Sequence, residues 1–228
     1  MKLEKITKRF DSSRRHYEDA CGAAHALDLI GERWALLVIR ELMFGPKRFS
    51  DLKADLPGIS ANVLTQRLEG LEETGIVARR KLPPPASVQV YELTPWGLEA
   101  WPILETMGRW AARSPHHDPS LPISAAGLLS SFRTMFSSER AGDMKASIGV
   151  RFGPESFLVR IGEGEISVTR KEFETADIIF EGTTAGLGAA VYGGQTFEAL
   201  AAEGALSVSG DRALAERFLT LFPLPPKA

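Results

Sequence analysis

Three prolines within nine residues divide this chain into two parts. The segment over residues 114–122 reads SPHHDPSLP, and proline removes a backbone donor and disfavours helix in the residue before it. No regular element is therefore expected to run through this segment. With 228 residues, the chain is long enough for two domains of roughly 100 residues each. We predict a first domain over residues 1–114, a linker over residues 115–122 and a second domain over residues 123–228.

Apolar residues at helical spacing dominate the first part, and a glycine, a proline or a capping hydroxyl marks the helix ends. Ser50 and Ser60 are expected to cap two of the helices, and Thr94-Pro95 opens another. The expected elements are helices over residues 23–30, 32–44, 51–56, 61–74 and 95–113, with strands over residues 76–81 and 88–93. This order is that of a winged helix-turn-helix, a fold that binds double-stranded DNA.

The helix expected over residues 61–74 has a polar face suited to reading DNA. At about 100° per residue, its leucines fall on one side and Asn62, Thr65 and Gln66 on the other. Asn and Gln side chains can bond adenine in the major groove, and hydroxyls serve phosphates. The net charge is only −2, so positive charge must be local, and residues 1–17 and 79–81 supply it. The predicted DNA contacts are Ser60, Asn62, Thr65, Gln66, Arg67, Arg79, Arg80 and Lys81.

Two stretches of the first part carry a resemblance to a known family. They read ALDLIGERWALLVIRELMFGPKRFSDLKADLPGISANVLTQRLEGLEETGIVARR and YELTPWGLEAWPILETMGRW, and with them residues 21–112 resemble the HxlR family of bacterial transcriptional regulators. The resemblance implies a homodimer on an inverted-repeat operator, often acting as a repressor. It implies a recognition helix over residues 60–70 and dimer contacts from residues 14–30 and 95–113. There Trp96, Trp101 and Trp110 either add to the dimer contact or pack inside the domain.

The single cysteine, Cys21, matches the N-terminal position at which several members of that family sense oxidants or electrophiles. Arg14, Arg15 and the start of the following helix can lower the pKa of its thiol. The proline that usually follows in the family is replaced by Gly22. A free cysteine is more often a small buried apolar side chain. Both interpretations of Cys21, redox sensor and structural residue, stay open.

The second part indicates an α+β arrangement of helices with an antiparallel sheet. We expect an amphipathic helix over residues 128–136, and Gly162-Glu163-Gly164 predicts a hairpin turn. Further expected elements are strands over residues 146–152, 156–161, 165–170, 176–181 and 205–208, two short helices capped by Thr183 and Thr196, and a last helix over residues 211–222.

The stretch GEISVTRKEFETADIIFEGTTAGLGAAVYGGQTFEALAAEGALSVSGDRALAERFLTLF makes residues 124–221 similar to the sterol carrier protein type-2 fold. That similarity implies an apolar cavity between sheet and helices. Large rings opposite the glycines and alanines within residues 186–194 permit such a cavity for an apolar or lipid-like effector, and the same composition permits a filled core. The predicted ligand-binding residues are Phe132, Phe136, Phe157, Phe180, Leu187, Val191, Phe197 and Phe218.

Enzyme signatures are absent from the sequence: there is no P-loop, no G-x-S-x-G elbow and no metal-ligand spacing of histidines. We expect no catalytic residues, no metal and no cofactor apart from the effector. Neither a membrane-spanning run nor a secretory signal is present. Together with what the two resemblances imply, these observations predict a dimeric, cytoplasmic repressor that binds operator DNA and is controlled by an apolar small molecule. Two alternatives remain: the second domain is an assembly module, with any sensing through Cys21, or it is a lipid-carrier or enzyme accessory.

Overall fold

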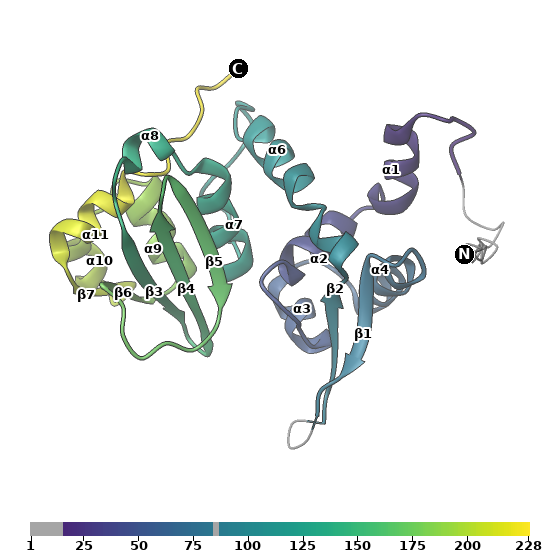
Figure 1. The fold of residues 1–228 in the computed structure, drawn as a ribbon, viewed down its shortest axis with the longest axis horizontal. Helices are drawn as coiled ribbons and strands as arrows, with labels where there is room; N and C mark the ends of the chain where they lie inside the picture. Colours follow the sequence, from purple (N-terminus) through teal and green to yellow (C-terminus); the bar gives the residue numbers. More distant parts are fainter. Residues whose placement is uncertain (1–15, 84–86) are drawn as a thin grey trace, which may run out of the picture.

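The computed structural model describes residues 16–83 and 87–228. Two groups of elements lie side by side, each around its own hydrophobic cluster (Figure 1). The winged-helix group comprises α1 (Gly22–Ile30), α2 (Ala35–Leu42), α3 (Phe49–Asp55), α4 (Ala61–Glu73), β1 (Val77–Lys81), β2 (Gln89–Leu93), α5 (Pro95–Leu98) and α6 (Trp101–Ala111). The sheet group comprises α7 (Ala125–Met135), α8 (Ser138–Ala141), β3 (Ala146–Phe152), β4 (Glu155–Gly162), β5 (Glu165–Arg170), β6 (Ile178–Gly182), α9 (Thr184–Tyr192), α10 (Phe197–Ala202), β7 (Leu206–Gly210) and α11 (Arg212–Leu219).

The winged-helix group has the expected order of elements. Leu52 of α3 and Leu64 and Leu68 of α4 are buried in one cluster with α2. The antiparallel pair β1–β2 forms the wing, in which Arg79 is the register partner of Tyr91. The third member of the wing is Lys47, whose backbone makes an isolated bridge to Tyr91. The wing is therefore tied to the segment between α2 and α3.

Three predicted features of this group differ from the structure. Helix α2 begins at Ala35, because Trp34 has a φ of 80° and a left-handed residue cannot sit inside a right-handed helix. Helix α3 begins at Phe49, so Ser50 lies inside it and does not cap it. The helix expected over residues 95–113 is broken into α5 and α6, because Pro102 cannot donate the hydrogen bond that would continue α5.

The sheet runs in the order β5-β4-β3-β6-β7 and is mixed, which corrects the antiparallel sheet predicted from sequence. Strands β3 and β6 are parallel. The connection after β5 crosses the sheet and brings the chain to the edge of β3 that β4 does not occupy, where β6 begins. Phe173 lies on this crossover and rests on Gly149 of β3, where an added Cβ would come within 2.2 Å of its ring. The glycine thus makes room for the connection that produces the parallel pair.

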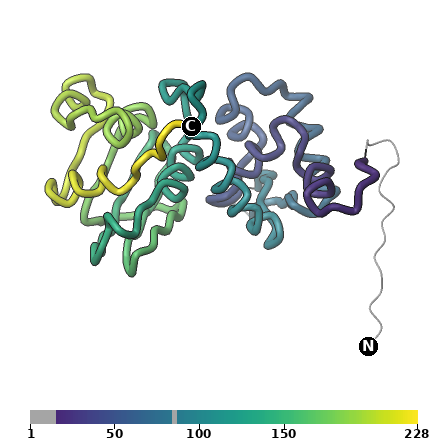
Figure 2. Tube along the Cα trace, turned by 90° about the horizontal axis from the view of Figure 1, so that it is seen from above, coloured from purple at the N-terminus to yellow at the C-terminus, as the bar shows by residue number. Residues whose placement is uncertain are grey.

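Helix α7 lies at the centre of the molecule and is buried almost all round, whereas an amphipathic helix was predicted over residues 128–136. Nine of its eleven residues are buried, since it lies against α2 and α6 on one side and against β5 and α9 on the other. The end of the chain also returns to the winged-helix group (Figure 2). There Lys227 Nζ donates to the carbonyl oxygens of Ala112 and Ser114, at 3.2 and 3.0 Å.

Candidate nucleic-acid interface

The outer face of α4 is polar and open to solvent. Asn62, Thr65 and Gln66 are exposed, as the helical spacing predicted. The opposite face carries Leu64 and Leu68, which are 0% and 1% exposed. The leucines fix the rotation of α4 on the core, so that its amide and hydroxyl side chains point away from it. A helix presented in this way fits the width of a major groove.

Ser60 fixes the start of α4. Its Oγ accepts the Val63 N–H at 3.2 Å, which satisfies one of the free donors at the helix N-terminus. The Ser60 hydroxyl hydrogen remains available to a phosphate oxygen. The N-terminus of a long helix also carries partial positive charge, which favours an anion. This end of α4 therefore suits a contact to the DNA backbone.

Arg67 lies on the flank of α4 that faces α1. Its Nη2 is 3.2 Å from Glu32 Oε2, and its side chain is only 19% exposed. It lines a groove of about 740 Å³, together with Gln66 and residues of α1. Unlike Asn62 and Thr65, Arg67 would have to leave an ion pair before it reached a phosphate or a guanine.

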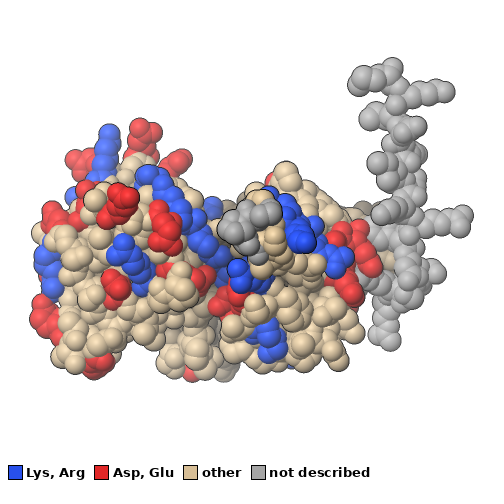
Figure 3. Space-filling view, turned by 90° about the horizontal axis from the view of Figure 1, so that it is seen from below, with Lys and Arg blue, Asp and Glu red and all other residues tan. Residues whose placement is uncertain are grey.

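The three basic residues of β1 are exposed but do not share one surface. Successive side chains of a strand alternate between its faces, so Arg80 points opposite to Arg79 and Lys81. Arg79 Nε is 3.5 Å from Glu72 Oε1 of α4, whereas Arg80 Nη2 is 2.7 Å from Glu92 Oε2 of β2. Seen from the side on which the wing projects, Lys and Arg side chains lie on both halves of the molecule, with carboxylates between them (Figure 3). The wing thus offers cations on two faces.

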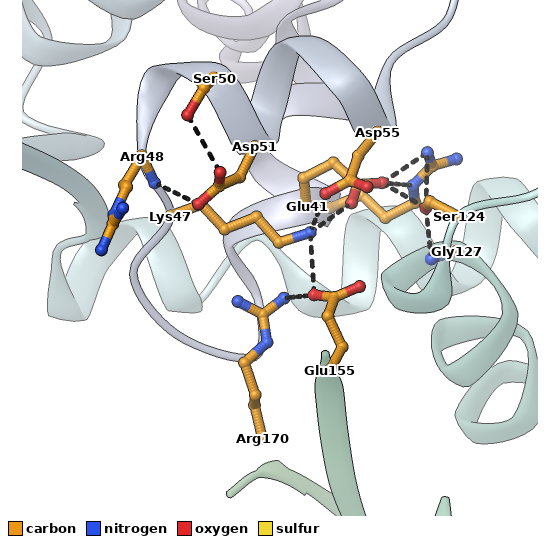
Figure 4. Close-up of polar contacts among 11 residues, drawn as sticks. Glu41, Lys47, Arg48, Ser50, Asp51, Asp55, Ser124, Gly127, Glu155 and Arg170 are labelled. Carbon is orange, nitrogen blue, oxygen red and sulfur yellow. Dashed lines mark hydrogen bonds and ion pairs between the residues drawn. The ribbon is translucent and has the colours of Figure 1, made fainter. Parts of the chain in front are cut away.

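Sequence reasoning did not select Arg48 as a candidate contact. It is exposed at the start of α3, next to the wing because its neighbour Lys47 pairs with Tyr91. Its side chain points away from the buried charges around Lys47 (Figure 4). A basic residue just before a helix-turn-helix helix is the signal that could have identified it. The basic N-terminal segment predicted to add charge lies, up to residue 15, outside the described residues.

The residues predicted to bind an effector all belong to one hydrophobic cluster of the sheet group. The phenylalanine cluster, as we call its aromatic centre, is closely packed. Phe132 stacks on Phe222 with ring centroids 4.6 Å apart, and Phe218 lies 5.8 Å from Phe132 and 5.6 Å from Phe180. The remaining ring of the cluster is Phe197, 6.0 Å from Phe180. Phe136 and Val191 are only partly buried at its margin, whereas Phe157 and Leu187 are fully buried.

Cys21 lies at the N-cap of α1 and is exposed. The backbone N–H groups of Ala23 and Ala24 hold the pKa of its thiol below the ordinary value. The start of the helix therefore has the predicted effect. The other predicted contributors, Arg14 and Arg15, lie outside the described residues. A thiolate at such a site is accessible to an oxidant.

No helix in residues 16–83 and 87–228 is both long and apolar enough to cross a membrane. In the same part of the chain, no three or more His, Cys, Asp and Glu side chains gather as a metal site would require.

Together, the helix pair α3–α4 and the wing define a winged helix-turn-helix protein. The family model described as HxlR-like helix-turn-helix matches residues 29–118. The uncharacterised regulator YvaP of Bacillus subtilis is 38% identical over 86 residues, which are 38% of this chain and 80% of YvaP. The chain belongs to the HxlR family of DNA-binding transcriptional regulators.

Other relatives cover the same region. The regulator YodB of B. subtilis is 40% identical over 86 residues, which are 38% of this chain and 77% of YodB. The solved structure of reduced YodB, at 36% identity, covers 43% of this chain and 98% of that chain, with a TM-score of 0.39. YodB has also been solved with a quinone bound. The family match ends at residue 118, so the sheet group is an addition to the part that the family describes.

Proposed function

We propose that this protein is a homodimeric repressor whose affinity for an inverted-repeat operator changes when its C-terminal domain takes up an apolar small molecule. The observation that carries the DNA-binding part is the exposed polar face of α4, with Asn62, Thr65 and Gln66. Two copies of such a helix, related by two-fold symmetry, match the two halves of a palindrome. Binding of a duplex selected from a random pool, and the symmetry of the selected sequence, test this part.

Large exposed apolar side chains on α1 and α6 support the dimer. Helix α6 buries none of its residues, and Trp110 is 74% and Met107 47% exposed, while Leu27 of α1 is 52% exposed. Exposed apolar surface of this extent is typical of protein–protein contacts. Sedimentation of Trp110→Ala should show a weaker dimer. The control is Leu224→Ala, at a side chain that is 47% exposed in the C-terminal segment after α11; equal dimer strength in both variants would contradict the proposal.

The similarity of residues 124–221 to the sterol carrier protein type-2 fold supports the effector. The site we propose is the phenylalanine cluster with Phe136, Phe157, Leu187 and Val191. Its rings contact one another, so uptake of a ligand requires them to separate. The bound and free arrangements then differ, and only such a difference lets an effector change DNA affinity.

Mass spectrometry tests the effector directly. The purified protein is measured under native and denaturing conditions, before and after incubation with a long-chain fatty acid. A defined extra mass that is lost on unfolding supports the effector site. If neither the purified nor the incubated protein carries extra mass, the phenylalanine cluster is a filled core and the effector proposal fails.

A second candidate is sensing through Cys21, with the C-terminal domain acting as an assembly module. The observation in its favour is the exposed thiol with its lowered pKa. With one cysteine in the chain, oxidation can join two subunits or attach a small thiol, but cannot close an internal disulfide. Loss of DNA binding after diamide treatment, absent in Cys21→Ser, would favour this candidate over the effector.

A further inference from the structure

Where the two groups of elements meet, charged side chains form a buried cluster (Figure 4). Glu41 is 0% and Lys47 3% exposed, so both charges have left water. Burial of a charge is costly unless it is paired and hydrogen-bonded. Three cations and three carboxylates balance here, and the ion pairs link them in one network. The members of this junction cluster are Arg40, Glu41, Lys47, Asp55, Glu155 and Arg170.

Lys47 is the centre of the junction cluster. Its Nζ is 3.0 Å from Glu41 Oε2, 2.5 Å from Asp55 Oδ2 and 3.7 Å from Glu155 Oε1. Glu41 and Asp55 come from α2 and α3 of the winged-helix group, but Glu155 begins β4 of the sheet group. Two of the three ammonium donors bond Glu41 and Asp55, and Glu155 of the sheet group adds a longer ion pair from the other side.

The sheet group holds Glu155 in place from its own side. Arg170 Nη2, on β5, is 3.0 Å from Glu155 Oε1, and its guanidinium lies 5.3 Å from the centroid of the Phe157 ring. A second contact crosses the junction nearby. Ser124, the N-cap of α7, donates its hydroxyl to Glu41 Oε1 at 2.6 Å. The position of the Lys47 ammonium is therefore set by both groups.

The backbone of Lys47 carries this position to the wing. Its N–H donates to the Tyr91 carbonyl at 3.0 Å, and the Tyr91 N–H donates back at 2.8 Å. Tyr91 is the register partner of Arg79 in β1, so one residue separates Lys47 from the basic strand. The backbone of Lys47 therefore joins the junction cluster to the wing.

We propose that Glu155 is a positioning residue for DNA binding, which acts through Lys47 to fix the wing against α4. The proposal rests on DNA binding by the winged helix and is independent of the effector. It makes the sheet group part of the DNA-binding unit. Residues that couple distant sites in this way typically change affinity by about 2- to 30-fold.

The test uses a duplex selected from a random pool by the wild-type protein. Glu155→Gln removes the charge at nearly constant volume and is expected to weaken binding by about 3- to 30-fold. The control is Glu198→Gln, at an exposed carboxylate that pairs with Arg212 in the same group. If Glu155 acts through the wing, then Arg80→Ala costs less affinity in the Glu155→Gln background than alone. Unchanged affinity, or fully additive losses, would overturn the proposal.

Amide hydrogen exchange tests the same assignment without DNA. The peptide that contains Gln89–Leu93 of β2 is expected to exchange faster in Glu155→Gln, and at the wild-type rate in Glu198→Gln. If Glu155→Gln does not fold, Glu155→Asp keeps the charge on a shorter side chain and should give a smaller change in the same direction. If the wild-type protein selected no duplex, only the proposal that it binds DNA would be refuted. Unchanged hydrogen exchange of the β2 peptide in Glu155→Gln would refute the role of Glu155.

Discussion

Helix α4 presents its polar side chains to solvent, whereas the sheet group turns its large rings inward against one another. On α4, Asn62 and Gln66 are exposed and can meet a partner without any rearrangement. In the phenylalanine cluster, Phe132, Phe180 and Phe218 are 0% exposed, so a partner must first separate them. The difference is between a polar surface that can meet a partner as it stands and a closed core that would have to open before a ligand could enter.

The largest expected effect tests whether the core is filled. Phe218 touches three other rings, those of Phe132, Phe180 and Phe222. Phe218→Ala should lower the free energy of unfolding by about 3–5 kcal/mol, because it leaves a cavity among contacting side chains. Urea unfolding measures the change. The slope of the free energy of unfolding against urea concentration is compared between the two proteins, because a changed slope would mean that more than stability had changed.

The control for this change is Phe136→Ala at the margin of the cluster. Its nearest ring centroid, that of Phe222, is 6.3 Å away, and the side chain is only partly buried. A clearly smaller loss of stability is expected there. If Phe218→Ala cost no more than Phe136→Ala, the rings would line vacant space, and the contrast with α4 would disappear.

The next effect concerns the surface of α4. Gln66→Ala should relax the preference for the base it contacts by about 1–3 kcal/mol, since a good bidentate contact provides that much discrimination. Competition between duplexes that differ at single positions measures it. The matched control is Gln195→Ala, an exposed glutamine of the sheet group. If the base preference were unchanged in Gln66→Ala, Gln66 would not be a base-contacting residue.

The helix face was predictable because its evidence is local. The spacing of Leu64 and Leu68 sets which side of α4 is buried, and Ser60 sets where the helix begins. The state of the phenylalanine cluster was not predictable, because filled cores and ligand cavities use the same residue types. A filled core and a ligand cavity are distinguished here only by the distances between the rings, which are in contact in this structure.

Contacts between the winged-helix group and the sheet group also could not be predicted from the sequence. Lys47 follows Gly45-Pro46 and looks like an ordinary loop lysine, yet it is 3% exposed. Its partner Glu155 is more than one hundred residues away, and no periodic pattern connects the two. The parallel pairing of β3 with β6 was missed because it also depends on residues far apart in the sequence. It follows from the path of the connection after β5, on which Phe173 packs against Gly149.

A smaller effect is expected from the wing, where Arg79 and Arg80 are each paired with a carboxylate. Arg80→Ala should weaken binding to all duplexes by a similar factor and reduce the slope of log affinity against log salt by about one. Because Arg80 must first leave Glu92, its net gain on binding DNA is reduced. Arg160→Ala, at an exposed arginine on β4, is the control and should leave the slope unchanged. Equal slopes in the two variants would show that Arg80 does not contact DNA.

The smallest expected effect is on Cys21, whose environment is exposed like α4 rather than closed like the core. Hydrogen bonds from the Ala23 and Ala24 N–H groups favour the thiolate and lower the pKa of the thiol. Alkylation by iodoacetamide should therefore reach half its maximal rate at a lower pH in the folded protein than in the urea-unfolded chain. The thiolate gains stability on folding, so Cys21 stabilises the fold slightly once the pH rises above its folded pKa. Identical alkylation profiles for folded and unfolded chains would mean that the start of α1 does not activate this thiol.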